Sequence, residues 1–129
     1  MSDLKKIETS DAPKAMGPYS QAIWAPPFVF VSGQIAIDPI TGKMVESNIE
    51  LQINRILDNL EPILKASGCS LENVVRYEIF LKDLNDFAIV NQECAKRFTQ
   101  PALPARQTVE VARLPLDALV EISCIAIQS

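Results

Sequence analysis

The sequence contains no histidine, and it contains only three cysteines, Cys69, Cys94 and Cys124. The absence of histidine excludes Ser-His and Cys-His nucleophilic systems, His-ligated zinc and histidine acid–base catalysis. The cysteines are odd in number and widely spaced, so no disulfide framework or metal-ligand spacing is indicated. We expect reduced, mostly buried thiols. Any chemistry must therefore use Glu, Asp, Tyr, Arg, Lys, backbone groups or water.

Basic runs and long apolar runs are also absent. The net charge is −4 and the pI is about 4.8, and no basic run exceeds Lys5-Lys6. This balance argues against a protein that binds nucleic acid by neutralising phosphates. The first eleven residues have no apolar signal region, and the longest apolar stretch, Ala22–Val31, is interrupted by Pro26-Pro27. We expect a soluble, cytoplasmic protein with no membrane partner.

The 129 residues have the size of one ordinary domain, and the sequence shows no repeat or linker. We therefore expect a single domain, residues 1–129. The order β-β-β-α-β-α-β-β predicts an α+β fold, a mixed sheet with two helices packed on one face. The expected strands span residues 4–9, 22–24, 28–37, 74–81, 106–112 and 119–127, and the expected helices span 46–67 and 87–98.

Capping residues suggest where the two helices begin and end. Ser47 is a plausible N-cap of the first helix, with Glu50 three residues later as in a capping box. Gly68 is a natural stop for that helix. Asn85 or Asp86 would cap the second helix.

Two helices can cover only one face of such a sheet. The apolar residues on both faces of 119–127 and 74–81 need a second cover. Because large exposed apolar patches are rare on soluble monomers, another copy of the chain is the simplest cover.

Two charged residues in the last strand pair are the first candidates for chemistry. Glu121 interrupts an apolar strand, and Arg106 opens its partner. A guanidinium is a natural bidentate partner for a carboxylate, and a partly buried glutamate can act as a base toward water. On residue chemistry alone, a structural ion pair between them, or with Glu110 or Arg113, is the favoured interpretation.

Three further positions have both a structural and a functional interpretation. Tyr19 is either a half-buried aromatic with its hydroxyl in water or a pocket residue. Ser32-Gly33-Gln34 interrupts a strand, so it is either an ordinary bulge or a place where polar backbone groups line a pocket. Asn91 is either a buried amide bonded to nearby backbone or a ligand-binding amide, and the first interpretation is favoured without further information.

Six short strings occur in order along nearly the whole chain: GPYSQA (17–22), VSGQI (31–35), DFAIVN (86–91), PAR (104–106), VEVARLP (109–115), and VEI with IA (120–126). Their order and spacing resemble the RidA/YjgF family of reactive-intermediate, enamine/imine deaminases. The resemblance implies a chorismate-mutase-like (RidA-like) α+β fold and a homotrimer with sites in the clefts between subunits.

The resemblance also implies an activity. Members hydrolyse 2-iminopropanoate and 2-iminobutanoate, or enamine tautomers such as 2-aminoacrylate, to 2-oxo acids and ammonia. Pyridoxal-phosphate enzymes release these unstable species, and neither a metal nor an organic cofactor is needed.

By position, Arg106 matches the family arginine that binds the substrate carboxylate, and Glu121 matches the glutamate that orients or activates water. Thr108 stands where many members carry a cysteine, so it would contact the ligand and could shift substrate range. The other residues that would line the cleft are Tyr19, Ser32, Gly33 and Asn91.

Other functions remain open. A non-catalytic 2-oxo-acid-binding regulatory module would use Arg106 without needing Glu121. Some members are described as translation inhibitors or endoribonucleases, but the acidic balance counts against an RNA partner here. Nothing in the sequence marks the exposed apolar surface that a holdase chaperone would use.

Overall fold

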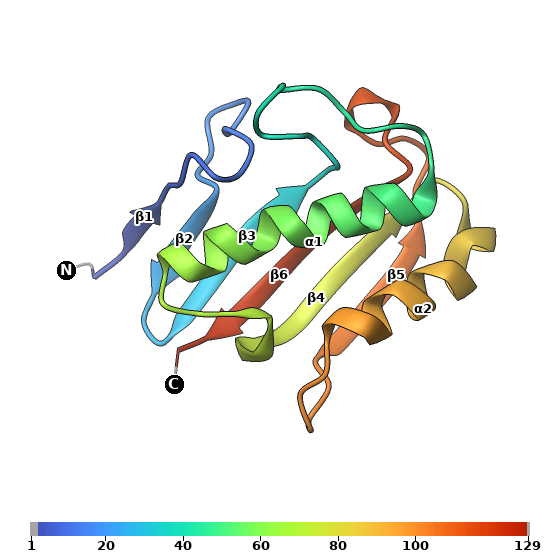
Figure 1. Cartoon of the computed structure of the whole chain (residues 1–129). Coiled ribbons are helices and arrows are strands. Elements are labelled where there is room, and N and C mark those ends of the chain that lie inside the picture. Colours follow the sequence, from blue (N-terminus) through green and yellow to red (C-terminus); the bar gives the residue numbers. More distant parts are fainter. Residues whose placement is uncertain (1–2, 129) are drawn as a thin grey trace.

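The computed structural model describes residues 3–128, which form one six-stranded sheet with two helices on the same face (Figure 1). The strand order is β1-β2-β3-β6-β4-β5, and only the pair β4–β5 is parallel. The α+β class and the expected order of elements are confirmed. The strands are β1 Lys5–Ile7, β2 Ala22–Ala25, β3 Phe28–Gln34, β4 Val74–Leu81, β5 Ala105–Glu110 and β6 Val120–Ile127.

Helix α1 (Ile49–Ala66) packs on the sheet through a stripe of fully buried side chains at three- and four-residue spacing: Ile53, Ile56, Leu57, Leu60, Ile63 and Leu64. Each such side chain contributes about 1.5–3 kcal/mol through burial. The helix continues through Pro62, and it ends before Gly68, which takes the positive φ of 78° predicted for a helix stop.

The predicted N-cap Ser47 is wrong. Asn48 caps α1, because its side-chain oxygen accepts a hydrogen bond from Leu51 N at 2.9 Å. Asn and Ser are comparably good caps, so composition did not distinguish these neighbours. The second helix, α2 (Phe87–Arg97), begins after Asp86, whose side chain makes no cap hydrogen bond.

Strand β3 is shorter than predicted, because a bulge between Val31 and Gln34 shifts its register with β6. Beyond the bulge, Ile35 and Ile37 leave the ladder and join a second, small core cluster with Leu114 and Ala118. This cluster supports the end of the sheet at which Glu121 lies.

The face of the sheet away from the helices is partly apolar and open. Phe28 and Phe30 are 40% and 45% exposed, and they pair across the ladder with Ile127 and Ile125. On β4 the same face is charged, since Arg76 and Glu78 lie 3.8 Å apart there. The second apolar face expected for β6 is therefore present and is extended by Phe28 and Phe30 of β3, whereas β4 combines Phe80 with the charged pair Arg76 and Glu78.

The predictions for the cysteines and for membrane-spanning helices can also be compared with the structure. All three cysteines are free and buried, as predicted. Within residues 3–128, neither helix is long and apolar enough to cross a membrane.

Candidate functional site

Arg106 lies on β5, the edge strand, beside Tyr77 of β4. Residues paired across neighbouring strands point to the same face, and Tyr77 is buried on the helix face, so Arg106 points toward α2. Its guanidinium carbon lies 5.3 Å from the ring centroid of Phe87, at the start of α2. The half-buried guanidinium is thus held against aromatic groups.

A cavity of about 340 Å³ adjoins this guanidinium. Asn91, one helical turn after Phe87, is exposed and lines the cavity, so the interpretation as a buried amide is wrong. The lining residues are Tyr77, Asn91, Cys94, Ala95, Phe98, Leu103, Pro104 and Arg106.

The expected structural ion pair is absent from residues 3–128. Arg106 and Glu121 form no ion pair with each other or with any described residue. Glu110 accepts a hydrogen bond from Leu84 N at 2.9 Å, and Arg113 pairs with Asp117 at 3.0 Å. Both candidate charges are therefore available to a ligand or to another chain.

Glu121 lies on β6, and its carboxylate occupies the space above Gly33 in the β3 bulge. A Cβ at residue 33 would lie 2.5 Å from Glu121 Oε2 and 2.9 Å from its Cδ. The bulge leaves room for the carboxylate, and Gly33 and Gln34 also line a small cavity, so this segment is both a bulge and part of a cavity wall. Burial raises the pKa of the Glu121 carboxyl above its ordinary value.

Tyr19 and Glu121 line a common small cavity of about 80 Å³, together with Gly33. Tyr19 is 51% exposed, and its hydroxyl accepts a hydrogen bond from Met16 N at 3.2 Å. The loop that carries Tyr19 is fixed by the buried Gln21, whose amide bonds the backbone of Thr9, Ala12 and Pro13. Sequence reasoning missed Gln21, because nothing local marks a glutamine as an anchor.

Ser32 and Thr108 differ in how their hydroxyls are used. Ser32 Oγ donates to Ser20 O at 2.6 Å, so it ties β3 to the Tyr19 loop. Thr108 Oγ1 is buried and has no hydrogen-bond partner in the described part of the chain. An unpaired buried hydroxyl is costly, which marks Thr108 as a position that an added group could satisfy.

The candidate residues fall into two separate groups. Arg106 and Asn91 line the cavity beside α2, whereas Tyr19, Gly33 and Glu121 lie together at another cavity. Strand β4 separates β5 from β6. Glu121 pairs with Phe80 and Arg106 pairs with Tyr77, and residues at this odd spacing on β4 face opposite sides of the sheet. Within one chain the two groups do not meet.

Tyr77, Phe87 and Cys94 surround Arg106 and were not candidates from the sequence. The helical spacing from Phe87 to Asn91 was a usable signal for Phe87. No local signal identifies Tyr77, because its place beside Arg106 depends on the parallel register of β4 and β5. Over residues 3–128, no cluster of three or more Cys, Asp or Glu side chains could hold a metal ion.

Comparisons with known proteins agree with this architecture. The family profile described as Endoribonuclease L-PSP matches residues 9–128. The mouse protein named 2-iminobutanoate/2-iminopropanoate deaminase is 44% identical over 124 residues, which are 96% of this chain and 91% of that protein.

Two solved structures superpose closely on this one. The Rid family protein YyfA from Yersinia pestis has a TM-score of 0.93 at 44% identity, covering 96% of this chain and 98% of the other. TdcF from E. coli, solved with bound serine, has a TM-score of 0.92 at 40% identity, covering 97% and 99%. With this fold, this identity and this coverage, the chain belongs to the RidA/YjgF (Rid) family, whose profile bears the endoribonuclease name.

Proposed function

We propose that the protein is a hydrolytic deaminase that converts 2-imino acids and their enamine tautomers, such as 2-iminopropanoate and 2-iminobutanoate, to 2-oxo acids and ammonia. The observation that carries this proposal is a pair of unneutralised, complementary groups, an arginine and a partly buried glutamate. The name of the mouse relative and the serine bound to TdcF support a small substrate of α-amino-acid size.

Arg106 would bind the substrate carboxylate. A guanidinium matches a carboxylate in a bidentate geometry, and each charge-assisted hydrogen bond contributes about 1.5–3 kcal/mol. Phe87 and Tyr77 leave the positive charge uncompensated, because neither is an anion. Asn91 and Thr108 lie on the same side of the sheet and would contact the same ligand, with Thr108 Oγ1 gaining a partner.

Glu121 would act on water. Its raised pKa, caused by burial, makes it a stronger base than an ordinary glutamate. Water adds to C2 of the protonated imine as Glu121 takes its proton. Glu121 then returns this proton to the amino group of the tetrahedral amino alcohol. The C–N bond breaks, ammonia leaves, and the hydroxyl proton passes to the Glu121 carboxylate as the C=O bond of the 2-oxo acid forms. Tyr19, Gly33 and the backbone at Ser32 would line the water's side of the cleft.

The complete site would lie between two chains. Arg106 and Glu121 lie on opposite faces of one sheet and are separated by β4, so one chain cannot present both to a single small ligand. A neighbouring copy packed on the open face around Phe28 and Phe30 would bring its own residues to the gap. We propose the homotrimer with three intersubunit clefts, in a chorismate-mutase-like arrangement.

A coupled assay tests this function. A dehydratase generates 2-aminoacrylate in situ, and the decay of the imine is followed with wild type, Arg106→Ala and Glu121→Ala. Loss of the bidentate contact is expected to lower kcat/KM at least about 100-fold, and loss of the base about 100-fold or more. Arg55→Ala, on α1 and outside both cavities, is the matched arginine control.

The assay also separates the other functions. If wild type does not speed imine decay, the deaminase function is wrong. If Glu121→Ala keeps the full rate, Glu121 does not activate water. A chain that binds 2-oxo acids through Arg106 without any turnover would be a regulatory binding module, and RNA cleavage that survives Arg106→Ala would indicate the endoribonuclease role.

A further inference from the structure

The guanidinium of Arg106 is surrounded by neutral groups. Phe87 presents its ring 5.3 Å away, measured from the ring centroid to the guanidinium carbon. Tyr77 is the cross-strand neighbour, and it lines the same cavity as Arg106 and Cys94. An acidic partner would neutralise the guanidinium and compete with a substrate carboxylate, whereas an aromatic face and a neutral phenol hydroxyl leave the positive charge unneutralised.

Tyr77 itself is rigidly held. It is only 5% exposed, and its ring stacks on Phe98 with centroids 4.4 Å apart and planes 19° apart. Burial is the main cause that raises the pKa of Tyr77 to about 12, while the contact with Arg106 acts in the opposite direction. The hydroxyl therefore stays protonated and neutral at working pH, and the full positive charge of Arg106 is retained.

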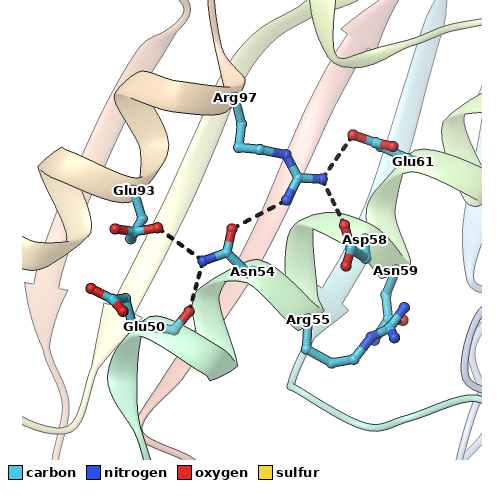
Figure 2. Close-up of polar contacts among 8 residues, drawn as sticks. All are labelled: Glu50, Asn54, Arg55, Asp58, Asn59, Glu61, Glu93 and Arg97. Atoms are coloured by element: carbon cyan, nitrogen blue, oxygen red, sulfur yellow. Dashed lines mark hydrogen bonds and ion pairs between the residues drawn. The ribbon is translucent and has the colours of Figure 1, made fainter.

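The docking of α2 places Phe87 beside Arg106, although Phe87 is 41% exposed. Figure 2 shows Arg97 of α2 reaching Asp58, Glu61 and Asn54 of α1, at 2.9, 2.8 and 3.3 Å. Asn54 also donates to Glu93 at 2.9 Å. These contacts anchor α2 on α1, and Phe87 is the first residue of the anchored helix.

We propose that Tyr77 and Phe87 are positioning residues that hold the Arg106 guanidinium in the orientation in which it binds the substrate carboxylate. This inference rests on the proposed function of Arg106. In this proposal the Tyr77 hydroxyl orients the guanidinium from the neighbouring strand, and the Phe87 ring packs against it. A substrate then meets an ordered fork of donors, so little side-chain entropy is lost on binding.

The test compares two ligands of nearly the same shape, 2-oxobutanoate and its uncharged amide, 2-oxobutanamide, by calorimetry on the full chain. Tyr77→Phe and Phe87→Leu are each expected to weaken 2-oxobutanoate binding about 5- to 10-fold. The same variants leave the affinity for the amide within about twofold, because it has no carboxylate for the guanidinium. Phe87→Tyr keeps the aromatic face and is expected to restore the affinity for the acid.

In steady-state kinetics we expect both variants to have a raised KM for the imine and a kcat near that of wild type. Unchanged affinity for the acid in both variants, or an equal loss for acid and amide, would overturn the positioning role, since a general structural defect affects both ligands alike. Either outcome would overturn the positioning role alone, because wild type would still hydrolyse the imine. A wild-type chain that neither binds 2-oxobutanoate nor speeds imine decay would instead overturn the proposed function together with this inference.

Discussion

The carboxylate of Glu121 occupies space that exists only because residue 33 is a glycine. Gly33 lies in the β3 bulge opposite β6, and the carboxylate lies over it beside a small cavity shared with Tyr19. The absence of a side chain at Gly33 thus allows the observed orientation of the Glu121 carboxylate. This relation makes the orientation of Glu121 testable separately from its presence.

Gly33→Ala is expected to lower activity at least about tenfold while changing the free energy of unfolding by no more than about 1 kcal/mol, because only a side chain must move. The new Cβ would lie 2.5 Å from Oε2, so the carboxylate must move. The movement costs little stability, because the displaced atoms are the end of a flexible side chain. Steady-state kinetics and urea unfolding of the variant check both parts. Full activity in Gly33→Ala would show that the position of the carboxylate does not matter.

Because the pKa of Glu121 is raised, activity and the stability contribution of this carboxyl should change in opposite directions with pH. Activity needs the ionised form, so kcat/KM should fall as pH drops through a pKa above that of an ordinary glutamate. A carboxyl whose folded pKa exceeds its unfolded pKa stabilises the fold at low pH, and that stability is lost as pH rises through the folded pKa. Glu121→Gln should therefore be nearly inactive yet at least as stable as wild type near neutral pH.

The pH–rate profile and thermal unfolding near neutral pH check this pair of outcomes, with Glu72→Gln as a control at an exposed glutamate. A Glu121→Gln variant that is clearly less stable than wild type would contradict the raised pKa. If the residual activity of Glu121→Gln falls at low pH just as that of wild type does, another group causes the fall.

The two charged positions could be found from the sequence, because a charge in an apolar strand is conspicuous. Their actual relation could not. The ion pair favoured for Arg106 and Glu121 is absent, since their strands are separated by β4 and their side chains lie on opposite faces. Tyr77 could not be identified as a neighbour of Arg106 from the sequence either, because strand register is set by tertiary packing and not by local pattern.

At the scale of elements, α1 and α2 are joined by a polar network around Arg97 and the buried Glu93 (Figure 2). Hydrogen bonds from Asn54 first, and then from Lys96, lower the pKa of Glu93. The helices could be predicted from apolar periodicity and the network could not, since its members lie up to 43 residues apart. The N-cap of α1 was predicted one residue too early, at Ser47 instead of Asn48.

Glu93 is expected to add to the acid sensitivity of the fold. Its folded pKa is depressed, so its contribution is present above the unfolded pKa and is lost as pH falls through the folded pKa. Glu93→Gln should lower stability near neutral pH and flatten the decline of stability from about pH 7 to about pH 3. Urea unfolding midpoints across that range check the result, against Glu72→Gln. Parallel pH curves for wild type and Glu93→Gln would contradict the role of this carboxylate.

At the scale of the molecule, the open face and the divided site point to the same conclusion. Apolar residues on β3 and β6 lack a cover, and the arginine and the glutamate lack a common cavity. A second chain on this face accounts for both observations. The need for a cover could be predicted from apolar residues on both faces of β6, but which residues each chain would contribute required the strand order.

The most direct test of a shared site is complementation between two inactive chains. Arg106→Ala and Glu121→Ala chains are co-expressed with different tags, and mixed oligomers are isolated and assayed for imine hydrolysis. If each site takes Arg106 from one chain and Glu121 from its neighbour, an isolated mixed trimer has both intact residues at about one third of its sites. Mixed trimers should then reach about a third of wild-type activity, although either variant alone is nearly inactive. Mixed oligomers that are no more active than the separate variants would contradict a site built between chains.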